Sequence, residues 1–155
     1  MKIQQKLQYK KRLHQYCIEI IQDRIDATLR SMQDAQDAAN SEEKSSAGDK
    51  YETGRAMSHL EKEMYARQLA ANKNELAALL AVDCYSICGS VGTGSIVICN
   101  GCRFFIAAGL GNVSFENENV YLLSPNAPLA KSLHNKVVGN TISFKNKEMA
   151  IKEVF

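Results

Sequence analysis

Two long stretches of the sequence carry apolar and small residues at helical spacing, and this pattern limits the possible folds most. Residues 3 to about 39 contain no Gly or Pro, and steps of three and four positions mark one stripe along a helix. That stripe consists of Ile18, Ile21, Ile25, Leu29, Met32, Ala35 and Ala39. A second helical stretch runs from about Asp49 to Ala81, with a stripe of Met57, Leu60, Met64, Leu69, Leu76 and Leu80.

Each predicted helix is about 45–55 Å long at 1.5 Å per residue, far longer than an average globular helix. Two long amphipathic helices joined by a short polar loop predict a helical hairpin, most simply an antiparallel coiled coil. The heptads are imperfect, with Thr28 and Asn72 near the seam. Because no third helix is available to cover the seam, we expect a two-stranded arm rather than a compact bundle.

Beyond Asp83, glycine becomes frequent and short β-prone runs replace the helical pattern. The predicted strands are Ser95–Cys99, Arg103–Ala107, Val120–Leu123, Thr141–Phe144 and Met149–Val154. Asn100-Gly101, between the first two strands, is the favoured pair for a two-residue type I′ turn. Residues 128–133 fit one short helix, with Pro128 near its first turn.

These patterns predict an α+β chain with two parts. An N-terminal antiparallel coiled-coil hairpin covers residues 1–82, with its tip near residues 40–52. A small, mainly antiparallel β domain with one short helix covers residues 83–155.

The net charge of +2 excludes a strongly basic nucleic-acid binder, although the charges are unevenly placed. The first dozen residues contain no acid and five bases, which are Lys2, Lys6, Lys10, Lys11 and Arg12. A solvated helix face is the favoured interpretation, and contact with an anionic partner is the other. No apolar run approaches the ~20 residues of a membrane span, and the N-terminus lacks the apolar core of a signal peptide. With an odd number of cysteines, the sequence predicts a cytoplasmic protein without a membrane partner.

Asp49 and Glu52 form the first candidate site. An Asp at the N-cap with a Glu three positions later has the form of a capping box, and both charges suit the positive end of a helix dipole. At the tip of an arm, however, two carboxylates can be delivered into a partner's cavity and hold Mg²⁺ through oxygen ligands. The partner would then supply the remaining ligands, and the two interpretations are compatible.

The cysteines form the second candidate site, a low-probability zinc site. Cys99 and Cys102 make a C-x-x-C, and Cys84 and Cys88 precede them, so four thiolates could bind tetrahedral Zn²⁺. A hairpin turn at Asn100-Gly101 already explains the C-x-x-C spacing, because its closing cross-strand pair would be Cys99 and Cys102. Structural thiols are therefore favoured over zinc, and zinc over a redox pair.

No motif in the sequence indicates a self-contained enzyme. A P-loop, a G-x-G-x-x-G and a nucleophile elbow are all absent. The histidines, His14, His59 and His134, do not pair with a Cys or Ser at a recognisable motif spacing.

Two segments together resemble the Gre transcription elongation factors. Gly48-Asp49-Lys50-Tyr51-Glu52 resembles the family's tip motif G-D-x-x-E-N, with Thr53 in place of the final Asn. The second segment starts at Ser124-Pro125 and continues over residues 128–140. It is similar to the family's S-P-[small/apolar]-A-[R/K]-A-L-L-G-K-x-V-G-D, with a short insertion after Ser-Pro. The order of arm and β-rich domain also matches, and in this family that domain is FKBP-like.

This resemblance implies a chain that binds bacterial RNA polymerase through its C-terminal domain and inserts its arm into the secondary channel. Asp49 and Glu52 map onto tip acids that help hold a catalytic Mg²⁺ shared with the polymerase, which then hydrolyses backtracked RNA. The implied docking residues are Ser124, Pro125, Lys131 and Lys136. Contact with the RNA 3′ end would occur only within the polymerase, and the chain would stimulate hydrolysis without being an enzyme.

Two other functions stay open from the sequence. One is a regulator that occupies the secondary channel of the polymerase without stimulating cleavage. The other is a coiled-coil interaction protein with no role at the polymerase, in which Asp49 and Glu52 only cap a helix.

Overall fold

The computed structural model describes the backbone of residues 1–45 and 49–155, and the side chains of residues 1–41 and 53–155. By its contacts the chain divides into two compact units, the helical unit Ile20–Asn74 and a unit formed by Met1–Glu19 with Glu75–Phe155. The last long helix ends at Leu80, and the compact units divide within the helices. The boundary expected at residue 82 stays a prediction.

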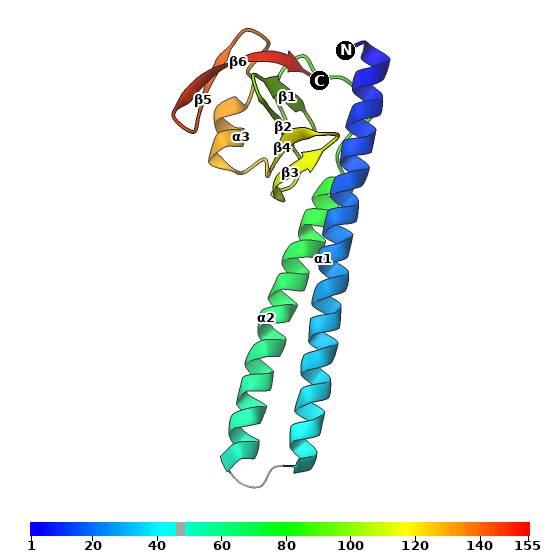
Figure 1. Cartoon of the computed structure of the whole chain (residues 1–155), viewed down its shortest axis with the longest axis vertical. Helices are drawn as coiled ribbons and strands as arrows, with labels where there is room; N and C mark the ends of the chain where they lie inside the picture. Colours follow the sequence, from blue (N-terminus) through cyan, green and yellow to red (C-terminus); the bar gives the residue numbers. More distant parts are fainter. Residues whose placement is uncertain (46–48) are drawn as a thin grey trace. The chain divides into compact units, whose positions relative to one another are not determined.

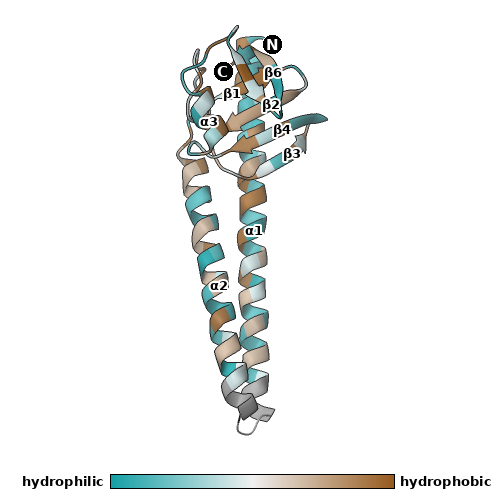
Figure 2. Cartoon of the chain, turned by 90° about the vertical axis from the view of Figure 1, so that its left-hand side faces the viewer, coloured by the Kyte–Doolittle hydropathy of each residue, from teal (hydrophilic) through white to brown (hydrophobic). Residues whose placement is uncertain are grey.

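Two long helices make up the N-terminal half of the chain, as predicted. Helix α1 spans Ile3–Ser45 and helix α2 spans Asp49–Leu80, and within the helical unit they run antiparallel, side by side (Figures 1 and 2). Helix α1 extends about six residues further than expected, because residues 40–45 contain neither Gly nor Pro to end it.

On α1, the seam of the helical unit largely follows the predicted stripe. Ile21 and Ile25 are buried, as expected. Leu29 is 46% exposed, while its neighbour Thr28 is buried and donates its hydroxyl to the Arg24 carbonyl at 2.9 Å. A polar side chain fits this seam because the preceding turn of its own helix accepts its hydrogen bond.

On α2, the predicted stripe is wrong over its first half and at its last position, because Leu80 is 63% exposed while its neighbour Leu79 is buried. Met57, Leu60 and Met64 are exposed, at 60%, 63% and 42%. The half-buried positions are instead Gly54, Ser58, Tyr65, Leu69, Asn72, Glu75 and Leu76. At 100° per residue the three exposed residues share one face, but that face is rotated by about 100° from the half-buried one. Their spacing is helical, so periodicity alone did not show which face would be buried.

Six strands form one sheet in the order β3-β4-β2-β1-β6-β5. The strands are β1 (Ile96–Cys99), β2 (Cys102–Ile106), β3 (Gly111–Phe115), β4 (Glu118–Leu123), β5 (Thr141–Phe144) and β6 (Lys147–Val154). All neighbouring pairs are antiparallel except β2 and β4, which pair in parallel. The β3–β4 hairpin returns the chain so that β4, not β3, lies beside β2, and this produces the one parallel pair.

Two-residue turns close three hairpins of the sheet. Asn100-Gly101 lies between the paired Cys99 and Cys102, as expected. Gly101 has a positive φ, but Asn100 does not. The predicted type I′ turn is therefore wrong, because that turn needs positive φ at both central residues. The type I′ pattern is found instead at Glu116-Asn117 and Lys145-Asn146, where both residues have φ between 50° and 62°.

The two faces of the sheet pack against different helices. Helix α3 (Pro128–Leu133) contributes Ala130 and Leu133 to a core that includes Phe104 of β2. On the opposite face, the Arg103 guanidinium lies over the Tyr9 ring of α1, 5.1 Å from its centroid. Figure 1 shows α3 and the start of α1 on opposite sides of the sheet. The first turns of α1 are thus part of the same unit as the sheet.

Candidate functional site

The acid pair stands at the beginning of the second long helix. Helix α2 starts at Asp49, so Asp49 and Glu52 lie three positions apart on helical backbone. Residues at this spacing are neighbours on one helix face, about 5–6 Å apart between Cβ atoms. Their side chains lie outside the described residues, so both the capping box and the metal-holding role stay predictions.

Among the described side chains, no group of three or more His, Cys, Asp or Glu residues could hold a metal ion. The residues around the tip acids lie outside the described side chains, so a metal site at Asp49 and Glu52 stays a prediction.

The Ser-Pro segment leads from β4 into α3 and helps to form a cavity. Ser124 closes a tight turn, with its hydroxyl oxygen accepting from the Asn126 N–H at 3.2 Å. Pro125 and Lys131 line a cavity of about 400 Å³. Its other lining residues are Gly92, Thr93, Ile106, Ala130 and His134. Apolar walls with a lysine and a histidine at the rim suit an apolar side chain that has an anionic neighbour.

The two lysines of the expected docking set have different environments. Lys131 is exposed beside the cavity, and among the described residues it makes no ion pair. Lys136 is half-buried, and its Nζ donates to the Thr141 carbonyl at 3.1 Å. The amine of Lys131 is therefore available to a partner, whereas that of Lys136 already stabilises the approach to β5.

The four cysteines weighed as zinc ligands do not form one group. Cys99 and Cys102 face each other across the β1–β2 turn, as the hairpin interpretation predicted, and Cys84 and Cys88 lie in the segment between α2 and β1. Cys102 Sγ lies 3.8 Å from Met149 Sδ. Burial raises the pKa of the Cys99 thiol to about 11. These surroundings favour protonated thiols that pack as small apolar side chains.

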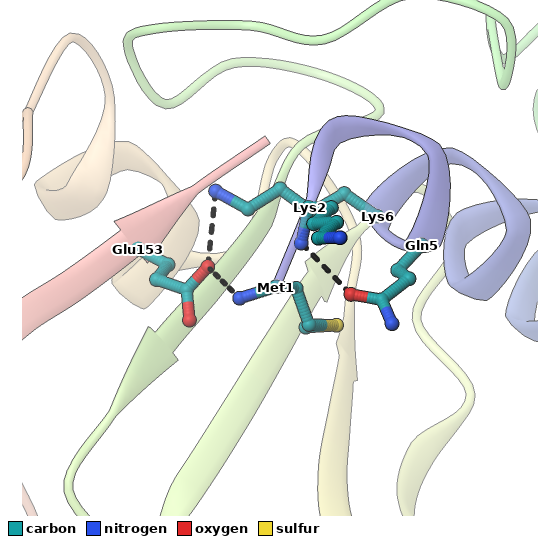
Figure 3. Close-up of polar contacts among 5 residues, drawn as sticks. All are labelled: Met1, Lys2, Gln5, Lys6 and Glu153. Carbon is teal, nitrogen blue, oxygen red and sulfur yellow. Dashed lines mark hydrogen bonds and ion pairs between the residues drawn. The ribbon is translucent and has the colours of Figure 1, made fainter.

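Four of the five N-terminal bases have partners within the chain. Lys6 Nζ lies 3.0 Å from Glu153 Oε2 and over the Phe155 ring, and Figure 3 shows Glu153 facing Lys6 and the amino group of Met1. Lys11 Nζ lies over a ring of the segment after α2, 4.4 Å from the Tyr85 centroid. A plain solvated face therefore does not describe this region, and contact with an anionic partner stays a prediction.

Sequence reasoning missed the role of Lys10, whose side chain is 1% exposed. The signal was present, because Lys10 continues the α1 stripe backwards through Leu13, Cys17 and Ile21 at steps of three, four and four. All three of these residues are buried. A lysine on the buried face of a helix is itself buried, unless its aliphatic chain is long enough there to bring the ammonium group to solvent.

Comparison with known proteins finds similarity to a solved structure. No model of a protein family matches the sequence, and no curated protein matches it. The chain is similar to a solved structure of the transcription factor Gfh1, with 17% identity over 88% of this chain and 92% of that chain, at a TM-score of 0.37. No helix in the described part of the chain is long and apolar enough to cross a membrane.

Proposed function

We propose that this chain is a Gre-like transcription elongation factor that binds bacterial RNA polymerase and stimulates Mg²⁺-dependent cleavage of backtracked RNA. One observation carries the proposal. Helix α2 begins at Asp49, so the Gly-Asp-x-x-Glu motif falls at the return of a hairpin whose helices have 43 and 32 residues. Asp49 is then about 48 Å from the far end of α2 at 1.5 Å per residue. Such a reach suits delivery of carboxylates into the secondary channel.

The β domain supplies the second support. The other Gre-like segment, which starts at Ser124-Pro125, leads into α3 and lines the cavity beside Lys131. One segment of the resemblance therefore begins a long helix and the other lines a cavity, and these are the features to which we assign channel entry and docking. We assign docking on the polymerase to Ser124, Pro125 and Lys131, with Lys136 holding the segment in shape.

The proposed metal is a Mg²⁺ ion shared with the polymerase. Asp49 and Glu52 would supply carboxylate oxygens, and the polymerase the remaining ligands. When bound, such an ion lowers the pKa of a coordinated water for phosphodiester hydrolysis. In this proposal the chain contributes two carboxylates three positions apart on α2, and the polymerase carries out the chemistry.

The deciding experiment is a cleavage assay on a stalled, backtracked polymerase with Mg²⁺. Adding the wild-type chain should release short 3′ RNA fragments. Asp49→Asn and Glu52→Gln should abolish that release while binding to the polymerase survives. Glu61→Gln, at an exposed position of the same helix, is the matched control and should cleave like wild type. Normal cleavage by both tip variants would show that the site assignment is wrong.

A second candidate is a secondary-channel regulator that does not stimulate cleavage, and Thr53 favours it. The Gre motif has Asn at this position, and a Thr changes the polar group beside the second acid. This candidate predicts polymerase binding and altered initiation or pausing, with little effect from either tip variant. A pull-down that recovers no polymerase would instead favour a coiled-coil interaction protein.

A further inference from the structure

The cavity beside α3 is assembled from separate parts of the β domain. Its lining residues come from the segment before β1 (Gly92, Thr93), the end of β2 (Ile106), and α3 with its flanks (Pro125, Ala130, Lys131, His134). Two backbone hydrogen bonds join the first of these parts to the last. The Val91 N–H donates to the Lys136 carbonyl, and the Asn135 N–H donates to the Val91 carbonyl, both at 2.9 Å. The backbone therefore holds two walls of the cavity together.

The inner surface of the cavity is apolar. Ile106 is 2% exposed and Ala130 is 3% exposed, and both belong to the hydrophobic core on the α3 side of the sheet. An apolar cavity of about 150 Å³ is large enough for benzene. At about 400 Å³, this cavity accommodates a six-membered ring or a branched aliphatic chain together with a polar group.

The rim of the cavity carries hydrogen-bond donors without internal partners. Thr93, Lys131 and His134 are exposed, and their side chains make no hydrogen bond or ion pair within the described part of the chain. The ammonium, the hydroxyl and a ring N–H of the imidazole can all donate. No Asp or Glu is among the described residues that line the cavity. The rim therefore suits an anionic group that accepts hydrogen bonds.

The glycine-rich segment at the rim is not built as a phosphate loop. A phosphate loop turns successive backbone N–H groups toward its ligand. Here the Gly92 N–H donates to the Ser95 hydroxyl oxygen at 2.9 Å, and the Gly94 N–H donates to the Ile106 carbonyl at 2.6 Å. The Ser95 N–H donates to the Gly92 carbonyl at 3.1 Å. Because these amides are already used, the few side-chain donors of the rim fit a carboxylate better than a phosphate.

We propose that this cavity binds a small carboxylic acid with an apolar body, such as an aromatic or branched-chain acid. The carboxylate takes hydrogen bonds from Thr93, Lys131 and His134, and the apolar body packs against Ile106 and Ala130. Lys131 is also assigned to docking, so a bound acid would compete with the polymerase. That competition rests on the proposed function, whereas binding of the acid does not.

The test titrates the full-length chain with benzoate at neutral pH and follows the backbone amide signals by NMR. Saturable shifts should appear at the cavity, on Gly92, Thr93, Lys131 and His134. Benzyl alcohol keeps the ring without the charge, and acetate keeps the charge without the ring. Each should bind about tenfold more weakly than benzoate, because each lacks one of the two contacts.

Substitution of Lys131 separates its charge from the shape of the cavity. Lys131→Gln should weaken benzoate binding about tenfold and leave the affinity for benzyl alcohol unchanged. Lys152→Gln is the matched control, because Lys152 is an exposed lysine on β6 and does not line the cavity. It should bind benzoate like wild type. Unchanged benzoate affinity in Lys131→Gln would overturn the proposal.

Two further results would also overturn the proposal: no saturable shifts with benzoate, or equal binding of benzoate and acetate spread over the exposed lysines. If the polymerase still bound through Lys131 in either case, the cavity would serve docking alone. Competition is measured separately, by titrating polymerase into the chain with and without benzoate. If benzoate binds in the cavity but leaves polymerase binding unchanged, the docking assignment is wrong and the acid site stands.

Discussion

Arg12 of α1 holds Glu116 of the β3–β4 turn in a two-point ion pair. Its Nε donates to Oε1 at 2.6 Å and its Nη2 to Oε2 at 3.2 Å. Glu116 has φ +51°, a left-handed conformation that side chains with a Cβ adopt at a cost. The ion pair gives this glutamate a contact that a glycine at the same position could not make. The neighbouring Phe115 ring packs on Tyr9 and Tyr16 of α1.

Removing the charge of Glu116 should weaken this contact modestly. Glu116→Gln should lower the free energy of unfolding by about 0.2–1 kcal/mol, because both partners are largely exposed and water screens the pair. Urea unfolding in low salt measures the change. In an Arg12→Ala background the same substitution should have almost no effect. An equal loss in both backgrounds would mean that the pair contributes nothing.

The same pair should make stability depend on pH in acid. The hydrogen bond from Arg12 lowers the pKa of Glu116 below its ordinary value of 4.5. The unfolded chain therefore binds this proton first, and the stabilisation present above pH 4.5 is lost as the pH falls through the folded pKa. Between pH 5 and pH 3, wild type should lose more stability than Glu116→Gln. Parallel curves for the two proteins would contradict the assignment.

Cys17 should give the opposite dependence in alkali. Burial, with a smaller effect from Cys84, raises the pKa of this thiol from 9.0 to about 12. Its contribution is complete below pH 9 and is lost as the pH rises towards 12, because only the unfolded chain ionises there. Under reducing conditions, wild type should lose more stability than Cys17→Ala between pH 8.5 and pH 10.5. Chemical denaturation at fixed pH values tests this, and equal slopes would refute it.

One isoleucine and one leucine on α1 should differ in how much stability the chain loses when each is replaced by alanine. Ile25 is 5% exposed and Leu29 is 46% exposed, only one turn apart. Ile25→Ala should cost about 2–4 kcal/mol through lost burial and a cavity, whereas Leu29→Ala should cost well under 1 kcal/mol. Thermal unfolding followed by helical circular dichroism compares them. A larger loss at Leu29 would contradict the placement of Ile25 in the seam.

Lys131 should matter for binding of the polymerase. Lys131→Glu reverses a charge at the rim of the cavity and should weaken binding about tenfold, an effect of about 1.4 kcal/mol. Lys152→Glu is the matched control, because Lys152 is also an exposed lysine but lies on β6, away from the residues that line this cavity. Binding titrations with purified polymerase give both values. Equal effects of the two substitutions would indicate only a general charge preference.

The helices and most strands could be predicted because their sequences carry strong local signals. The long Gly- and Pro-free run predicted α1, and the predicted short helix at Pro128–Leu133 matches α3 at both ends. Strand β3 was missed because its residues, Gly-Asn-Val-Ser-Phe, include turn formers and bury no side chain fully. It is an edge strand, and its pairing with β4 stabilises the extended conformation that its own sequence favours only weakly.

The features that could not be predicted from the sequence depend on contacts between residues far apart in the chain. No local pattern shows that Glu116 faces Arg12, 104 positions away, or that Lys10 donates to the Ser86 carbonyl, 76 positions away. The buried face of α2 was equally hidden, because exposed Met57 and Leu60 are as apolar as the residues of a seam. For the candidate site, the tip acids and the docking segment were named from the sequence, but the cavity beside Lys131 required the fold.

The discontinuous unit formed by Met1–Glu19 and Glu75–Phe155 has a consequence for how the chain folds. Its two parts meet only when the intervening 55 residues, Ile20–Asn74, are closed into a loop. A flexible loop of that length carries an entropic cost that grows with the logarithm of its length. If the antiparallel hairpin forms first, from contacts nearer in sequence, it removes much of that freedom, because α1 and α2 run in opposite directions within the helical unit. The hairpin proposed to enter the polymerase would therefore also increase the rate at which the β domain packs on the first turns of α1.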